Sequence, residues 1–218
     1  MISTRHLRLV LLVAAVFGAG MLWVRVARRA ADPLTAAARE TPLHDLVQHD
    51  GRWYPPGQTN PFTGLMVDRD PNGALLSRCQ VSNGLLNGVS ECWYTNGQIQ
   101  AREYFKDGVS NGQRQKWHEN GRLLSQAQIA QGKVTGTFRS WHDNGQLSEQ
   151  IEMKLGKADG IAWAYYPSGF IKAETTVRDG QVLDRKSWND GERAASAPPP
   201  RSISPPAAGE KALSQVMR

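Results

Sequence analysis

The sequence predicts an all-β protein: an antiparallel sheet of tandem 24-residue β-hairpin repeats, preceded by one N-terminal transmembrane helix. Three observations lead to this fold class. Glycines recur every 24 residues, aromatic residues recur in step with them, and a charge-free apolar run lies near the N-terminus. Self-similarity at a fixed period of this length is typical of an array of like supersecondary units.

The apolar run covers residues 9–24 (LVLLVAAVFGAGMLWV). As a helix it would be about 24 Å long, slightly short for a hydrocarbon core of roughly 30 Å. Arg8 and Arg25 flank it, and their side chains can reach the two interfaces. We therefore expect a membrane anchor over residues 1–26, with a cleaved signal peptide as the alternative. A short linker, 27–42, follows.

The repeat domain is expected over residues 43–193. Three residue series share the 24-residue period. One glycine series is Gly64, Gly88, Gly112, Gly136 and Gly160, and a second is Gly84, Gly108, Gly132, Gly156 and Gly180. The third is the dipeptide series Asn72-Gly73, Asn96-Gly97, Asn120-Gly121, Asn144-Gly145 and Ser168-Gly169.

Each unit has the pattern of a hairpin. The positions 11 and 17 residues after the first glycine are always apolar, so alternate residues share one face of a strand. Asn-Gly between two such runs is a strong hairpin signal, because both residues accept positive φ. Each unit is therefore predicted as strand, Asn-Gly turn, strand and a glycine-flanked return to the next unit.

The return between units suggests a cross-strand pair. If the turn is centred between Leu85 and Leu86, Cys79 lies opposite Cys92, and Glu103 lies opposite Lys116 one repeat later. These are the only two cysteines of the chain, and in an oxidising compartment we expect them to form a disulfide. The alternative is two reduced thiols that pack as small apolar groups.

The ends of the array are expected to be atypical, because a repeat domain must cap itself. Residues 52–54 are predicted as an opening strand, and residues 185–188 as part of a closing half-unit. Residues 194–218 are rich in Pro, Ala and Ser and contain few large apolar residues. This composition predicts a disordered tail.

The net charge of +6 does not belong to the repeats. Residues 43–193 contain 17 Lys or Arg and 17 Asp or Glu, which cancel, and the excess basic residues lie in the two ends of the chain. A phosphate-binding surface would need its basic residues within the folded domain. Nucleic acid is therefore not an expected partner.

The sequence contains no recognisable catalytic motif, and we expect neither an enzyme nor a cofactor. His118 and His142 occupy the same repeat position, so about 10 Å should separate them, too far to share one metal ion. Together with Tyr94 and Tyr166 they are interpreted as an aromatic surface stripe, and no metal site is predicted. The candidate binding site is instead the aromatic ladder formed by Trp93, Trp117, Trp141 and Tyr165. The alternative is that these rings form the hydrophobic core of the sheet.

The units resemble the bacterial variant of the MORN repeat. The resemblance rests on segments such as 117–123 (WHENGRL) and 141–147 (WHDNGQL), and on the lead-in 60–64 (NPFTG). It covers about two-thirds of the chain, roughly residues 46–191. It implies an elongated, single-layer antiparallel sheet that interacts with proteins or lipid, and it carries over no catalytic residues. Similar proteins are often labelled antitoxin components of toxin–antitoxin systems.

These features favour a membrane-tethered protein-interaction scaffold, with an antitoxin-like role as one form of it. The alternative is an envelope module that binds glycan or lipid through the aromatic ladder. The expected location is the bacterial inner membrane, with a single span and the repeats in the periplasm. If the N-terminal segment is cleaved, the protein is instead secreted or periplasmic.

Overall fold

The computed structural model describes residues 40–195. The expected membrane anchor, most of the linker and residues 196–218 of the tail lie outside these residues. Within the described chain, no helix is long and apolar enough to cross a membrane.

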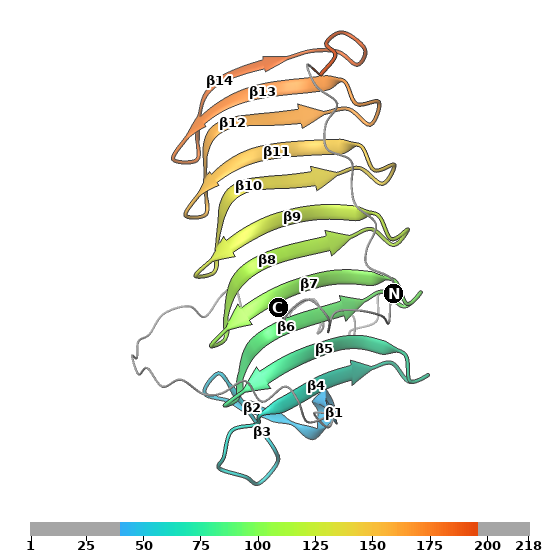
Figure 1. Ribbon diagram of the computed structural model, residues 1–218, viewed down its shortest axis with the longest axis vertical. Helices are drawn as coiled ribbons and strands as arrows, with labels where there is room; N and C mark the ends of the chain where they lie inside the picture. The colour runs from blue at the N-terminus through green and yellow to red at the C-terminus, as the bar shows by residue number, and fades with distance from the viewer. Residues whose placement is uncertain (1–39, 196–218) are drawn as a thin grey trace, which may run out of the picture. The chain divides into compact units, whose positions relative to one another are not determined.

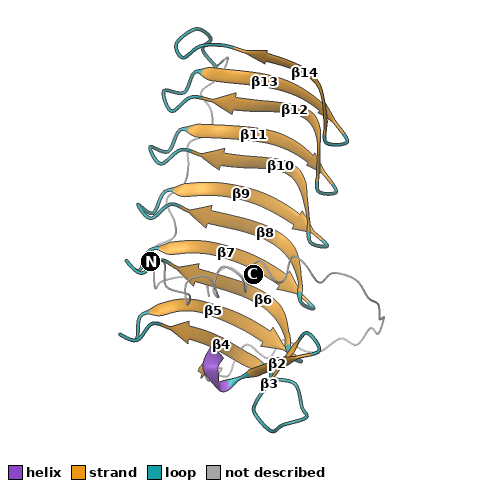
Figure 2. Cartoon of the chain, turned by 180° about the vertical axis from the view of Figure 1, so that it is seen from behind, coloured by secondary structure: helices purple, strands orange, loops and turns teal. Residues whose placement is uncertain are grey.

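The prediction of an all-β chain built from successive hairpins is confirmed (Figure 1). Twelve strands of the described chain form one sheet in the order β1-β4-β5-β6-β7-β8-β9-β10-β11-β12-β13-β14, and β2 and β3 form a second, two-stranded sheet. Figure 2 shows how short turns join consecutive strands. The strands are β1 (Glu40–Pro42), β2 (Val47–His49), β3 (Arg52–Tyr54), β4 (Gly64–Arg69), β5 (Leu75–Ser82), β6 (Leu85–Trp93), β7 (Ile99–Lys106), β8 (Val109–Trp117), β9 (Leu123–Ala130), β10 (Lys133–Trp141), β11 (Leu147–Lys154), β12 (Lys157–Tyr165), β13 (Ile171–Arg178) and β14 (Gln181–Ser187), with one 3-10 turn, η1 (Leu43–Asp45).

The described chain divides into two compact units. The first comprises residues 40–91, 103–112 and 129–133, and the second comprises residues 92–102, 113–128 and 134–195. In the first unit β4 pairs with β5 in antiparallel register, and β1 pairs with β4 in parallel, which is the exception to the expected antiparallel pattern. The core of this unit is formed by Leu46, Phe62, Met66, Cys79 and Val81.

The alternation predicted from the apolar periodicity is visible in the burial of β5. Ser77, Cys79 and Val81 are buried, and the residues between them are partly exposed. The predicted opening strand is present as β3, and it is fixed by backbone bonds from Trp53 N–H to the Gly84 carbonyl and from Phe62 N–H to the Trp53 carbonyl. The lead-in segment thus closes the N-terminal end of the array.

In the second unit, β10 to β14 pair in sequence as antiparallel strands. Its core cluster consists of Trp117, Leu123, Trp141 and Leu147, with Ile99 and Tyr165 packed against it. Trp141 pairs directly with Leu147 across β10 and β11. Tyr165 pairs likewise with Ile171 in the next hairpin, so the aromatic and aliphatic series recognised in the sequence meet across these two hairpins.

The sequence predicts two residues with positive φ in each Asn-Gly turn, whereas the structure has such pairs in the glycine-flanked returns. In the loop of Thr95, Asn96 and Gly97 only the glycine has a positive φ, of 82°. The Gly97 N–H donates to the Tyr94 carbonyl, as in a type I turn followed by a left-handed residue. The glycine-flanked returns are two-residue turns in which both residues have positive φ, such as Asn83 at 50° and Gly84 at 76°.

One return turn carries a residue that fits this backbone poorly. Leu155 has a φ of 51° and is exposed, whereas the equivalent positions of the other units are Asn83, Asp107, Gln131 and Asp179. A left-handed backbone is unfavourable for branched side chains and is tolerated by Asn and Asp.

Leu155→Asn should therefore stabilise the protein against urea by about 0.5–1 kcal/mol, because Asn adopts left-handed φ at lower cost. The matched substitution Asp179→Leu, at the same position of the next return, should destabilise it by a similar amount. Equal unfolding midpoints for the two variants would contradict the explanation.

Candidate functional site

The predicted aromatic ladder is mostly core. Trp117 and Trp141 are 1% and 4% exposed, and both pack in the core cluster of the second unit. Trp93 and Tyr165 are half-buried, and burial raises the pKa of the Tyr165 phenol. The interpretation of the ladder as an open binding surface does not fit the two central rings, because a ligand could reach them only by displacing the core.

The indole of Trp117 shows how the central rings are held. Its Nε1 is buried and has no hydrogen-bond partner in the described part of the chain. A buried donor without an acceptor costs about 1–3 kcal/mol. The ring therefore stays in place through apolar packing against its neighbours, which offsets this cost.

The residue after each ring forms a second series, which connects neighbouring units. Each of these side chains bonds to the backbone carbonyl of the aromatic residue one unit later. The bonds are Tyr94 Oη to Trp117 O at 2.8 Å, His118 Nε2 to Trp141 O at 2.9 Å, His142 Nε2 to Tyr165 O at 3.0 Å and Tyr166 Oη to Trp188 O at 3.0 Å. Because a carbonyl only accepts, the side chains donate, and each histidine carries its proton on Nε2.

The sequence placed these four residues in a surface stripe and did not predict this role. Tyrosine and histidine are both long enough to reach the next unit and both offer a donor at the tip. Burial raises the pKa of the Tyr94 phenol, which keeps its proton available for this bond. The series is therefore a set of clamps between units rather than an open aromatic surface.

The turn asparagines connect the same units at the sheet edge. Their Nδ2 atoms donate to carbonyls one unit later, and their Oδ1 atoms accept the amide two residues ahead. The donor bonds are Asn96 to Glu119 O at 3.0 Å, Asn120 to Asp143 O at 2.9 Å and Asn144 to Pro167 O at 2.7 Å. The accepted amides belong to Gln98, Arg122 and Gln146. These positions thus require the two functional groups of asparagine, not its tolerance of positive φ.

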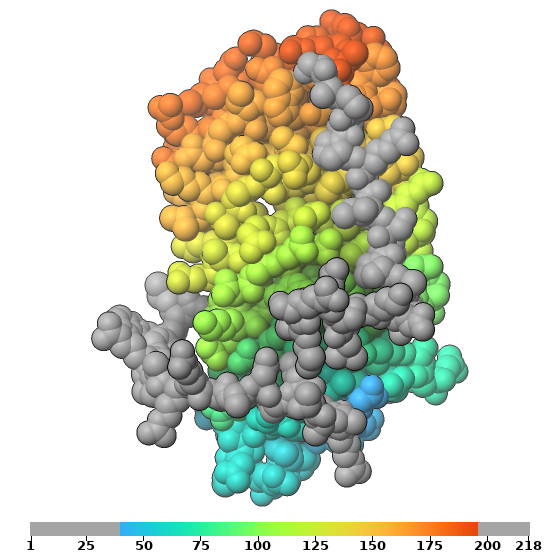
Figure 3. All heavy atoms as spheres, viewed as in Figure 1, coloured from blue at the N-terminus to red at the C-terminus, as the bar shows by residue number. Residues whose placement is uncertain are grey.

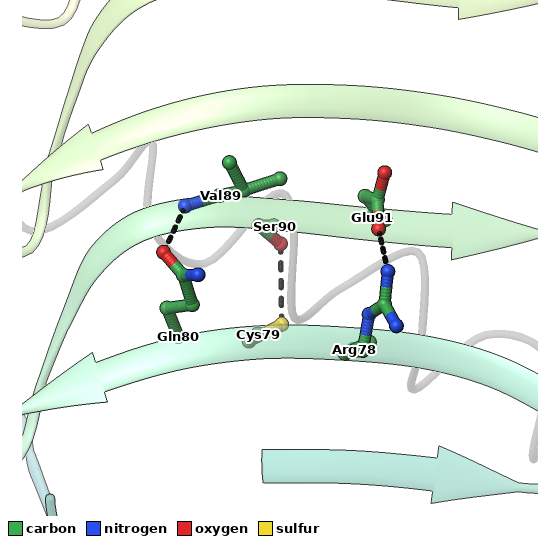
Figure 4. Close-up of polar contacts among 6 residues, drawn as sticks. All are labelled: Arg78, Cys79, Gln80, Val89, Ser90 and Glu91. Atoms are coloured by element: carbon green, nitrogen blue, oxygen red, sulfur yellow. Dashed lines mark hydrogen bonds and ion pairs between the residues drawn. The ribbon is translucent and has the colours of Figure 1, made fainter. Parts of the chain in front are cut away.

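The cross-strand neighbours of β5 correct the predicted register. The return turn is Asn83-Gly84 rather than a turn centred between Leu85 and Leu86. Across β5 and β6, Cys79 Sγ lies 3.1 Å from Ser90 Oγ (Figure 4). The return is a two-residue turn, and after the equivalent return between β11 and β12 the strand register shifts by a bulge.

Ser90, and not Cys92, is therefore the cross-strand neighbour of Cys79, and the register argument for the disulfide is wrong. Both cysteines are buried thiols in this structure. Burial raises the pKa of the Cys79 thiol, and the nearby Glu91 carboxylate adds to this effect. A Cys79–Cys92 disulfide stays a prediction, to be decided by mass mapping under non-reducing conditions.

The same strand pair contains a partly buried polar cluster (Figure 4). Arg78 Nη2 donates to Glu91 Oε2 at 2.6 Å, and the Glu91 side chain is 8% exposed. The Gln80 side chain accepts the Val89 amide at 2.9 Å. This contact explains the first glycine series at one position, because a Cβ on Gly88 would lie 1.8 Å from Gln80 Oε1. The polar side chains of this cluster thus bond to one another or to the backbone of the neighbouring strand.

The predicted closing half-unit contains a cluster that the period could not reveal. The Arg193 guanidinium lies 4.3 Å from the ring centre of Trp188 and 6.0 Å from that of Trp163, and it pairs with Glu174 at 3.8 Å. The Arg193 carbonyl accepts the Ile171 amide at 2.9 Å. Arg193 follows the last repeat, so no series in the sequence identified it.

Histidine, cysteine, aspartate and glutamate, the usual metal ligands, occur throughout residues 40–195. No group of three or more His, Cys, Asp or Glu in this part of the chain is arranged to hold a metal ion. His118 and His142 are engaged with backbone carbonyls, as described above.

Asn120→Ala should lower the free energy of unfolding by about 1–2 kcal/mol, because it removes one donated and one accepted hydrogen bond. Asn72→Ala is the matched control at the same repeat position, where no side-chain bond to a later unit is found in the described chain. Urea unfolding measures both, and an equal effect of the two substitutions would contradict the proposed role of the turn asparagines.

Comparison with known families agrees with this geometry. Residues 86–107 and residues 134–155 each match the family described as MORN repeat variant. The two segments begin two periods apart and cover the equivalent hairpins β6–β7 and β10–β11. No curated protein matches the chain. Over these two segments the chain is similar to the MORN repeat variant, and both segments lie within the hairpin array.

Proposed function

We propose that this protein is a non-enzymatic protein-interaction scaffold, tethered to a membrane by residues 9–24. The observation that carries the proposal is the repeated clamp between units, in which equivalent side chains bond to the same backbone position one unit later. Such an array gives an extended, regular surface, and repeat proteins commonly use such surfaces to bind partners. MORN repeats generally serve as modules that interact with proteins or membranes.

The potentially reactive side chains of the repeats form hydrogen bonds within the fold, and this also supports a scaffold function. The two histidines of the repeats bond to carbonyls, and the buried Glu103 carboxylate accepts a hydrogen bond from the Ser110 hydroxyl. Cys79 contacts Ser90 and is buried. A general acid, base or nucleophile must be able to reach a substrate, and these groups are occupied by the fold.

The charge distribution favours a protein partner over a polyanion. Acidic and basic residues are equal in number across residues 43–193, so no strong field of one sign covers the repeats. Exposed strand residues such as Tyr104 and Ile161 offer apolar contact area among these charges. The binding surface is therefore expected on exposed strand residues rather than on the buried ladder.

The membrane tether and the location belong to the same proposal. The apolar run and its flanking arginines support an uncleaved single span in the inner membrane, with the repeats in the periplasm. The glycan or lipid alternative depended on open rings, and the burial of Trp117 and Trp141 leaves it without a supporting observation. An antitoxin-like role would specify a toxin as the protein partner, and partner capture would identify it.

A photo-crosslinking amino acid at Tyr104, Lys116, Gln128 or Ile161 should trap a discrete protein adduct in the membrane fraction, because all four side chains are exposed on strands. Mass spectrometry of the adduct identifies the partner, and samples kept from light are the control. Failure to trap a protein from any of the four positions would contradict the scaffold function. Recovery of the chain in the soluble fraction would contradict the tether alone.

A further inference from the structure

The first Asn-Gly turn, between β4 and β5, has the same backbone as the later ones. The Gly73 N–H donates to the Asp70 carbonyl at 2.9 Å, as the Gly97 N–H does to the Tyr94 carbonyl. The φ values of the two glycines are 86° and 82°. In the space-filling view, the teal turn projects at the right edge of the molecule with its outer atoms uncovered (Figure 3). Exposure is common to the four turn asparagines, Asn72, Asn96, Asn120 and Asn144.

The first turn differs from the others in its asparagine side chain. In Asn96, Asn120 and Asn144, the side-chain nitrogen and oxygen are both hydrogen-bonded. In the described part of the chain, the Asn72 side chain forms no hydrogen bond, because the Asp70 carboxylate takes its role. Asp70 Oδ1 accepts the Asn72 amide at 2.8 Å and the Ala74 amide at 2.9 Å. The Asn72 side chain is therefore free to rotate.

The sequence explains why only this asparagine is free. Asp70 occupies the repeat position that holds Tyr94, His118 and His142 in the next three units. Those longer side chains bond to a carbonyl one unit later. Aspartate is shorter, and its carboxylate bonds to backbone amides of its own turn, as is common for this residue. One substitution at the clamp position thus accounts for the difference.

A free asparagine before a glycine can react with its own backbone. The Gly73 nitrogen attacks the Asn72 side-chain carbon, Cγ, and loses its proton to solvent base. The bond from Cγ to Nδ2 then breaks, and ammonia leaves with a proton from water, so a five-membered succinimide ring remains. Water adds to either ring carbonyl and opens the ring to aspartate or isoaspartate. Glycine favours the attack because it has no Cβ to obstruct it.

The hydrogen bonds of the later turn asparagines oppose this reaction. The side-chain amide must rotate toward the next backbone nitrogen, and in those units the rotation breaks one donated and one accepted bond. The loss of two net hydrogen bonds corresponds to a rate roughly tenfold to a hundredfold lower. The backbone bond of the turn glycine is 2.9 Å long in all four turns, so it does not contribute to the difference.

The charges beside the first turn oppose one another. Arg69 Nη1 donates to the Gly73 carbonyl at 3.1 Å, and Nη2 pairs with Glu40 at 2.8 Å. A nearby cation favours loss of the Gly73 amide proton, whereas the Asp70 carboxylate disfavours it. The free side chain of Asn72 is therefore the feature that distinguishes this turn. A carboxylate formed there would have Arg69 as a countercharge.

We propose that Asn72 is a site of spontaneous modification, which water converts to aspartate and isoaspartate in the folded chain. At the same time Asn96, Asn120 and Asn144 keep their amides. The first hairpin then gains a negative charge beside Arg69, and isoaspartate also lengthens the backbone of the turn. The reaction needs no enzyme, and water does not reverse it, so the modified fraction rises with the age of the chain. This inference does not depend on the proposed function.

Peptide mass mapping of the full chain, purified in a mild detergent and incubated at mildly alkaline pH, tests the proposal. Trypsin releases Asn72 within residues 70–78 and Asn120 within residues 117–122, and neither peptide contains another asparagine. The change from amide to carboxyl should be at least about tenfold faster at Asn72. In urea, which removes the bonds of the fold, the two rates should become similar. Equal rates in the folded chain, or the same ratio in urea, would overturn the proposal.

Asp70→His tests the cause of the difference, because it introduces the clamp residue of two later units. The Ala74 amide then becomes available to the Asn72 side chain, and conversion of Asn72 should slow about fivefold. Asp45→His, the same change outside the turn, is the matched control and should leave the rate unchanged. A rate unaltered by Asp70→His, with Asn120 still protected, would contradict the proposal. If Asn120 loses its protection, the variant has unfolded, and the comparison in the unaltered chain decides.

Discussion

The hydrogen bond from each return-turn glycine to the preceding return is the constraint on which the array depends. Four such bonds recur at the 24-residue period, a fifth joins Gly84 to Phe62 of the lead-in segment, and all five are 2.7 to 2.8 Å long. The donor glycine and the residue before it both take left-handed φ, which aims the N–H at the neighbouring return. Because the bond fixes where each hairpin begins relative to the one before it, it accounts for the second glycine series in the sequence.

The opposite edge of each hairpin is held by side chains rather than by turn backbone. There the clamp residues Tyr94, His118, His142 and Tyr166 and the turn asparagines reach carbonyls one unit later. Between these two edges the buried rings of Trp117 and Trp141 supply apolar packing. Hairpins that would be marginal alone are stabilised by their neighbours, as expected for a repeat array.

The sequence predicted the hairpins well because their signals are local and repeated. It predicted a pair of positive-φ residues in the Asn-Gly turns, but such pairs lie in the returns. Asn-Gly fits a type I′ turn, but it also fits an Asx-type turn in which the asparagine side chain bonds to the backbone. The predicted register at Cys79 took no account of the first glycine series, whose members lie inside strands with positive φ, as Gly160 does where the register of β11 and β12 shifts. Nor could periodicity decide whether the tryptophans were open or buried, because alternation assigns a residue to a face but does not say what covers it.

The structure also distinguishes the two ends of the array, which the period treats alike. The lead-in strand β3 is bonded to the first return through Trp53 and Gly84, whereas β14 has one free edge. The side chains that could act as acids, bases or nucleophiles form contacts within the array. Acidic and basic residues are equal in number across the repeats, so the remaining surface is charge-balanced. These features favour interaction at strand faces and edges over chemistry at a single site.

Hydrogen exchange at the return-turn glycines is the most direct measurement of this account. The amides of Gly108, Gly132, Gly156 and Gly180 should exchange as slowly as those of the central strands, although turn amides normally exchange quickly. Each of them donates to a carbonyl of the preceding return in the structure. Fast exchange at all four glycines, with protected strands beside them, would show that these bonds do not hold the hairpins together.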